Sequence, residues 1–182
     1  MPTIDTLTQR NQEFAAHQFS AGLPLMPSLR VMIISCADPR VDPANVLGLN
    51  PGEAVVIRNV GGRITPGTLQ NMALLQAVGE QGPNVVPQSA AAPGDFNLIV
   101  LHHTQCGITR LVDKPEMLAS YFGIDLVQLA DKAVSDPHAS VVVDVAALKA
   151  NPMLPANWTV TGLVYDVTTG LVEVVVPPNT IR

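Results

Sequence analysis

Aromatic side chains are scarce in this sequence, and its basic side chains do not cluster. Only 4% of the residues are Phe, Trp or Tyr, which argues against a module that binds by base stacking or through an aromatic cage. Ten Lys and Arg stand against fifteen Asp and Glu, so the net charge of -5 gives no basic footprint for nucleic acid or an anionic membrane. We therefore expect a small-molecule partner, with no nucleic acid and no membrane involved.

Long apolar runs are also missing. No stretch approaches the roughly 20 apolar residues of a membrane-spanning helix, and residues 1–5 lack the basic and apolar regions of a signal peptide. We therefore expect a cytoplasmic protein. Hydrophobic residues nonetheless make up 47% of the 182 residues, which is enough for a well-filled core, and we predict that 1–182 form a single domain.

Cysteine occurs only twice, at Cys36 and Cys106. In a reducing cytoplasm we expect no structural disulfide between them, which leaves metal binding, catalysis or simple burial. Both lie near residues that bind metals, because Asp38 follows Cys36 and His103 precedes Cys106. Two thiolates and one imidazole would give a tetrahedral zinc ion three protein ligands and an open fourth position, the arrangement of catalytic zinc sites. The sequence therefore predicts such a site.

Signals for strands and helices alternate along the chain. Continuous apolar runs predict strands buried on both faces, at 31–34, 54–57 and 96–101. Prolines and capping residues predict helices, a short one from Pro43 and longer ones at 66–81, 115–122, 125–134 and 137–150. A last pair of strands is expected at 159–165 and 171–176. This alternation predicts a doubly wound α/β fold with a mainly parallel central sheet flanked by helices.

Two segments are expected to lie outside the sheet. Residues 1–28 form an N-terminal helical arm, with an amphipathic helix over 4–19 that we expect to pack on another surface. Residues 83–95, rich in Pro, Ala, Gly and Ser, are predicted to be a surface loop without fixed secondary structure.

The candidate metal ligands follow two of the predicted strands. Cys36 lies just past the end of the first strand, and His103 and Cys106 follow the third. Ligands of doubly wound sheets bind beyond the carboxyl ends of the strands, so the three residues converge on the expected place. His102 and His103 point to opposite faces of their strand, and the spacing to Cys106 favours His103 as the ligand.

The remaining candidates have more than one interpretation. His102, His17 and His138 are taken as ordinary core or surface residues. Asp38 could fill the fourth coordination position, orient a zinc-bound water, or cap a turn. Arg40 is well placed to bind Asp38 bidentately and keep it ionised. The other interpretation is that Arg40 is an ordinary solvated charge on the surface.

Four motifs, in this order, resemble the β-class carbonic anhydrases, and the third is closest to the short, double-histidine branch of that family. They are Cys36-x-Asp38-x-Arg40, Val56-Ile57-Arg58-Asn59-Val60-Gly61-Gly62, Leu101-His102-His103-Thr104-x-Cys106-Gly107 and Gly162-Leu163-Val164-Tyr165-Asp166-Val167-x-Thr169-Gly170. The match covers residues 29–112 and 158–175. It implies the family's fold with a C-terminal strand hairpin, and an active site at a dimer interface, hence a homodimer or higher homo-oligomer.

The resemblance also implies roles for the site residues. Cys36, His103 and Cys106 would hold Zn2+, with Asp38 and Arg40 as the catalytic pair beside it. When Asp38 pairs with Arg40 the site is active, whereas Asp38 bound directly to zinc as a fourth ligand closes it. The implied reaction is the reversible hydration of CO2 to bicarbonate by zinc-bound hydroxide.

Two other functions stay open at this point. The same branch includes carbonyl sulfide and carbon disulfide hydrolases, and the core motifs do not separate these from carbonic anhydrases. A non-catalytic structural or regulatory zinc module, with Asp38 as a permanent ligand, is the alternative from another functional class.

The sequence departs from the family pattern at three places. They are Gln105, which is often acidic in relatives, Gly62-Arg63, where Gly-Asn is commoner, and the longer loop at 83–95. None of these removes a ligand, but Gln105 is expected to alter hydrogen bonding around the metal.

Overall fold

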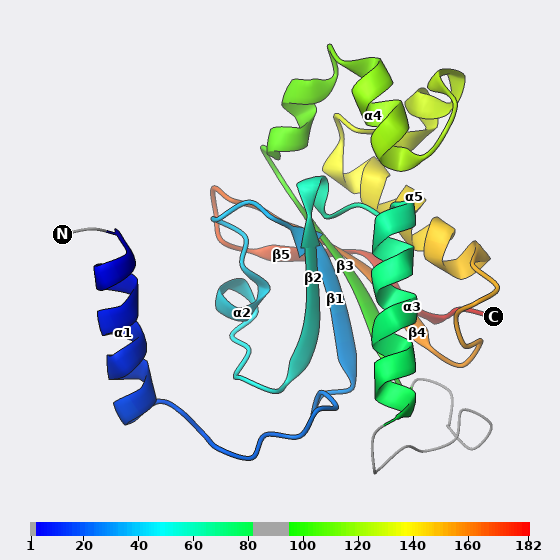
Figure 1. The fold of residues 1–182 in the computed structure, drawn as a ribbon. Helices are drawn as coiled ribbons and strands as arrows, with labels where there is room; N and C mark the ends of the chain where they lie inside the picture. Colours follow the sequence, from blue (N-terminus) through cyan, green and yellow to red (C-terminus); the bar gives the residue numbers. More distant parts are fainter. Residues whose placement is uncertain (1–2, 82–94) are drawn as a thin grey trace.

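The computed structural model describes residues 3–81 and 95–182 (Figure 1). Its centre is a five-stranded sheet in the order β2-β1-β3-β4-β5. The strands are β1 (Val31–Cys36), β2 (Ala54–Asn59), β3 (Asn97–His103), β4 (Thr159–Tyr165) and β5 (Val172–Thr180). β1 to β4 are parallel and β5 is antiparallel to β4, so the predicted sheet and its closing strand pair are confirmed. Except for Asp95, the loop predicted at 83–95 lies outside the described residues.

The helices begin close to the predicted capping residues. They are α1 (Thr3–His17), α2 (Pro43–Val46), α3 (Pro66–Glu80), α4 (Pro115–Phe122) and α5 (Pro137–Ala150), with 3-10 segments η1 (Val60–Gly62), η3 (Gly107–Leu111) and η4 (Leu126–Lys132). The side chains of Asp42, Thr65 and Asp136 accept backbone N–H groups in the first turns of α2, α3 and α5.

Two element predictions differ from the structure. The helix expected at 125–134 is the 3-10 segment η4, none of whose residues is fully buried, and Leu129 is its one residue that packs against a core cluster, so little apolar burial supports a full α-helix there. The last strand begins at Val172 and continues to Thr180, beyond the predicted end at 176, because it keeps its pairing with β4 past two register shifts.

The core lies on both faces of β1 and β3. Alternate residues of β1 face opposite sides, with Met32 and Ile34 in one cluster and Val31 and Ile33 in another. The first cluster is completed by side chains of α3 and α5, which cover one face of the sheet in Figure 1. The second is covered from the α2 region, through residues 46, 47 and 49. The central strands are thereby packed against side chains on both faces.

The N-terminal arm is helical, as predicted, but it contacts little of the described chain. None of the residues of α1 is buried, and Figure 1 shows the helix standing away from the sheet. Ile4, Leu7 and Phe19 in this arm are more than half exposed. Over the described ranges, the model contains no helix with the length and apolar character needed to cross a membrane.

Candidate metal centre

The carboxyl ends of two adjacent strands bring the predicted ligands together. From β1 the chain leads to β2 on one side, and from β3 it leads to β4 on the other, so the crevice between β1 and β3 is the switch point where doubly wound sheets bind ligands. Cys36 is the last residue of β1 rather than the first beyond it, and His103 is the last of β3. Ligand atoms of Cys36, His103 and Cys106 all lie within 4.8 Å of one another.

The spacing of these atoms suits a shared metal ion. The three side chains are buried, with exposures of 4% for Cys36, 1% for His103 and 8% for Cys106. The two Sγ atoms are 3.7 Å apart. Tetrahedral zinc with Zn–S bonds of about 2.3 Å would place two sulfur ligands about 3.8 Å apart, so the pair needs little adjustment to take the ion.

The imidazole of His103 is oriented to offer its Nε2 atom. Nδ1 lies 2.9 Å from the carbonyl oxygen of Thr104, which can only accept, so Nδ1 carries the hydrogen. Nε2 keeps its lone pair, is buried, and has no hydrogen-bond partner among the described residues. A buried acceptor without a partner is costly, and a metal ion in front of it removes that cost. The donor set of two thiols and one imidazole nitrogen therefore fits zinc.

The contact between the two cysteine sulfur atoms shifts their pKa values in opposite directions. A hydrogen bond from the Cys106 thiol lowers the pKa of Cys36 to about 4, against the opposing effect of burial. The same interaction raises the pKa of Cys106. The His103 side chain and the backbone N–H groups of Asp38 and Gly61 further lower the pKa of Cys36. These contacts favour the thiolate form of Cys36, which is the form in which cysteine binds a metal.

Asp38 and Arg40 form the bidentate pair expected from their spacing. Arg40 Nε donates to Asp38 Oδ1 at 3.0 Å, and Nη2 donates to Oδ2 at 2.7 Å. This contact holds the pKa of Asp38 well below its usual range. Oδ2 of Asp38 lies 3.9 Å from His103 Nε2, the atom that faces the metal position. An ionised carboxylate is therefore held beside the three ligands without being one of them in this arrangement.

Arg58 is a site residue to which the sequence alone assigned no role. Its Nε donates to the carbonyl oxygen of Cys36 at 2.9 Å, and its Nη2 donates to that of Asp38 at 2.7 Å. Nη1 pairs with Asp42 at 2.8 Å. One guanidinium therefore fixes the backbone turn that carries both Cys36 and Asp38. The sequence could have indicated it, because Arg58 lies within the second of the four family motifs.

Gly62 packs against the backbone beside a ligand, and we expect Gly62→Ala to lower stability by at least about 2 kcal/mol. Its φ is +68°, and an added Cβ would lie 2.9 Å from the backbone nitrogen of Cys36. Thermal unfolding should show the loss. Gly107→Ala is the matched control, because a Cβ there meets no atom within 4 Å. Equal unfolding temperatures for the two variants would contradict the close packing.

The other histidines lie away from the ligand position, as predicted. His102 is buried on the opposite side of β3, with Nδ1 2.8 Å from the Ser140 hydroxyl and Nε2 3.2 Å from the carbonyl oxygen of Gly62. His138 is exposed and lies 3.0 Å from Glu173. His17 is the exposed last residue of α1.

Gln105 acts on the site through its backbone. Its φ is +54°, and its carbonyl oxygen accepts a hydrogen bond from Arg40 Nη2 at 3.1 Å. Its side-chain amide donates to the Thr168 hydroxyl at 3.4 Å. The main chain at this position thus helps to orient Arg40, whichever side chain it carries.

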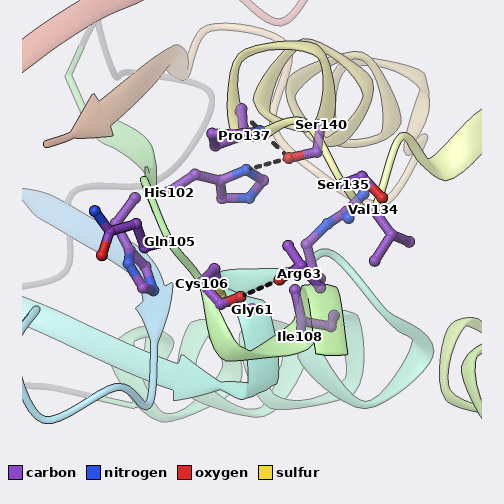
Figure 2. A pocket seen from close by; sticks show the side chains of 12 residues that line it. Gly61, Arg63, His102, Gln105, Cys106, Ile108, Val134, Ser135, Pro137 and Ser140 are labelled. Atoms are coloured by element: carbon purple, nitrogen blue, oxygen red, sulfur yellow. Dashed lines mark hydrogen bonds between the residues drawn. The ribbon is translucent and has the colours of Figure 1, made fainter. Parts of the chain in front are cut away.

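A cavity of about 240 Å³ lies beside the ligands (Figure 2). Its lining includes His103, Gln105 and Cys106. It also includes His102 and Ser140 of α5, which Figure 2 shows joined by a hydrogen bond. The cavity is therefore bounded by residues of the metal centre and by the start of α5.

Comparison with known proteins agrees with this geometry. The carbonic anhydrase family model matches residues 31–172. Beta-carbonic anhydrase 1 of Mycobacterium tuberculosis is 28% identical over 179 residues, covering 97% of this chain and 100% of that protein. A carbon disulfide hydrolase of Acidianus sp. is 25% identical over 193 residues, covering 91% of this chain and 85% of the hydrolase.

Solved structures show the same relationship. The crystal structure of carbonic anhydrase from Streptococcus mutans matches with a TM-score of 0.70 at 31% identity, covering 96% of this chain and 98% of that one. The apo form of carbon disulfide hydrolase matches with a TM-score of 0.58 at 25% identity, covering 93% of this chain and 88% of that one. With the family model spanning most of its length, this chain belongs to the β-class carbonic anhydrase family.

Proposed function

We propose that this protein catalyses the reversible hydration of CO2 to bicarbonate with a zinc ion held by Cys36, His103 and Cys106. The observation that carries the proposal is the position of Asp38. Its carboxylate lies 3.9 Å from the unpartnered Nε2 of His103 and is held there by Arg40. Three buried ligands leave a tetrahedral ion one open position, and a fixed acceptor stands beside it.

When bound, the zinc lowers the pKa of a coordinated water and so supplies hydroxide near neutral pH. Asp38 is placed to accept a hydrogen bond from the attacking oxygen and would orient it toward the carbon of CO2. Arg40 keeps Asp38 ionised and prevents it from turning to the metal as a fourth ligand. Water and CO2 give bicarbonate and one proton, and the proton passes to buffer from this partly exposed edge of the site.

A sulfur analogue is the second candidate substrate. The similarity to a carbon disulfide hydrolase over most of this chain favours it, since the same ligand set would serve hydrolysis of carbon disulfide or carbonyl sulfide. A non-catalytic zinc module is the third reading. It has less support, because Asp38 is paired with Arg40 instead of pointing its carboxylate at the metal position as a permanent ligand.

Parallel assays on one zinc-quantified preparation test the substrate. We expect stopped-flow measurements to show CO2 hydration well above the uncatalysed rate at pH 7 to 9, a range around and above the zinc-water pKa of about 7. Hydrogen sulfide release from carbonyl sulfide and carbon disulfide is measured beside it. Rapid sulfide release without CO2 hydration would replace the proposal by the second candidate. Zinc content near one per chain with neither activity would favour the non-catalytic module.

We further propose a homodimer or higher homo-oligomer built from a single domain. The exposed apolar side chains of α1 support it, because a second copy would cover them. A cytoplasmic location remains the expectation from the sequence.

A further inference from the structure

A buried ion pair lies behind the metal centre, and the proposed reaction makes no use of it. Arg63 Nε donates to Asp144 Oδ2 at 2.7 Å and Nη2 donates to Oδ1 at 3.3 Å, with each side chain 1% exposed. Asp144 Oδ2 also accepts from the backbone N–H of Ile64 at 3.2 Å and lies 3.2 Å from His102 Nε2. The three side chains come from the end of η1, from β3 and from α5.

Stability alone does not account for this pair. Removing two charges from water costs free energy that their attraction only roughly offsets, and apolar residues of similar volume often serve as well. Asp144 lies in a polar environment, in which four nitrogen donors surround its carboxylate. Such a network specifies one geometry of the groups around it.

The groups that it fixes belong to the metal centre. Arg63 directly follows the Gly61-Gly62 turn, and His102 Nε2 is 3.2 Å from the carbonyl oxygen of Gly62. Gly62 packs directly against the end of β1, where an added Cβ would lie 2.9 Å from the backbone nitrogen of the ligand Cys36. On the other side, His102 is the neighbour of the ligand His103 in β3. The network therefore contacts the turn that packs beside Cys36 and the strand that carries His103, and these two ligands lie on different strands.

Apolar packing does not hold this turn from the side of α5. The 240 Å³ cavity lies there, and its lining includes Gly61, Arg63, His102 and Cys106 (Figure 2). Within residues 3–81 and 95–182, Arg63 Nη1 has no hydrogen-bond partner. On this side, polar contacts rather than close apolar packing fix the position of the turn.

We propose that Arg63, Asp144 and His102 are positioning residues for the metal centre. They fix the Gly61-Gly62 turn against the end of β1, which carries Cys36, and they fix the end of β3, which carries His103. The inference rests on the proposed metal site. Residues that orient metal ligands from outside typically contribute 10–100-fold to metal affinity, and we expect about 10-fold or more here.

The test replaces both charges together, as Arg63→Met/Asp144→Leu, so that no unpaired buried charge remains. Zinc affinity is measured by competition with a chromophoric chelator, and the Co2+-substituted protein reports the sulfur ligands by its charge-transfer absorption. We expect a folded variant that binds zinc about 10-fold more weakly or worse and has a shifted or weakened cobalt band. Should the double variant fail to fold, Asp144→Asn, which keeps the volume, is expected to change both measurements in the same direction.

Val145→Ala is the matched control for a loss of stability alone. Val145 neighbours Asp144 on α5, is buried, and packs in the core away from the ligands. We expect a lower unfolding temperature with unchanged zinc affinity and cobalt spectrum. Parental affinity and spectrum in the charge-free or Asp144→Asn variant would overturn the inference, as would an equal loss in Val145→Ala. A parent protein that binds no zinc would instead refute the proposed metal site.

Discussion

Replacing His103 with Asn should remove zinc binding and lower CO2 hydration on the order of 10³-fold, because hydroxide at neutral pH depends on the metal. The amide of Asn can still donate to the Thr104 carbonyl, as His103 Nδ1 does at 2.9 Å, but it offers no atom where Nε2 lay. Two thiolates alone form an incomplete site that loses the ion to chelators. Zinc content after dialysis and stopped-flow rates measure the effect.

The same substitution at His138 is the control. That side chain is exposed, lies at the start of α5, and contacts Glu173 at 3.0 Å. His138→Asn should keep one zinc per chain and the full rate. If His103→Asn also retained a full equivalent of zinc after dialysis, His103 would not be a ligand.

Local chemistry made much of the fold predictable. Asp42, Thr65 and Asp136 each precede a proline at the first helical position, and each caps a helix in the structure. Apolar runs located the strands, and β1 and β3 are largely buried because the core covers both of their faces. The burial predicted for 54–57 was wrong, since β2 lies at the edge of the sheet and only its Ile57 is buried. The ligands could then be placed together, since the carboxyl ends of such strands meet at one edge of the sheet.

Contacts between distant segments could not be predicted in this way. Arg63 and Asp144 are separated by 81 residues, and nothing in the local pattern indicates that they meet. The sequence treated Arg63 only as a departure from a motif, and it left Asp144 without a role. The pairing arises from the packing of α5 over the end of η1, which short-range periodicity does not encode. The same holds for Arg58, whose acceptors lie about twenty positions away in the chain.

Replacing Asp38 with Ala should lower kcat for CO2 hydration about 10²-fold or more while zinc stays near one per chain, because a positioned acceptor contributes about 10²–10⁴-fold in such reactions. Arg40 engages both carboxylate oxygens of Asp38, so the loss of this carboxylate is expected to leave the three proposed ligands in place. Stopped-flow rates and zinc content are measured on the same sample. Loss of zinc in this variant would identify Asp38 as a structural ligand.

Asp136→Ala separates this effect from a general loss of stability. Asp136 is an exposed carboxylate that caps α5 by accepting from the backbone N–H groups of His138 and Ala139. Losing the cap should cost about 1 kcal/mol of stability and leave turnover unchanged.

The pH dependence of kcat provides an independent test of the role of Asp38. Because Arg40 holds the pKa of Asp38 well below its usual range, the carboxylate stays ionised throughout pH 6 to 9. Any titration of kcat in that range therefore belongs to another group. We expect Asp38→Ala to lower kcat at every pH from 6 to 9 and to leave the shape of the pH profile unchanged.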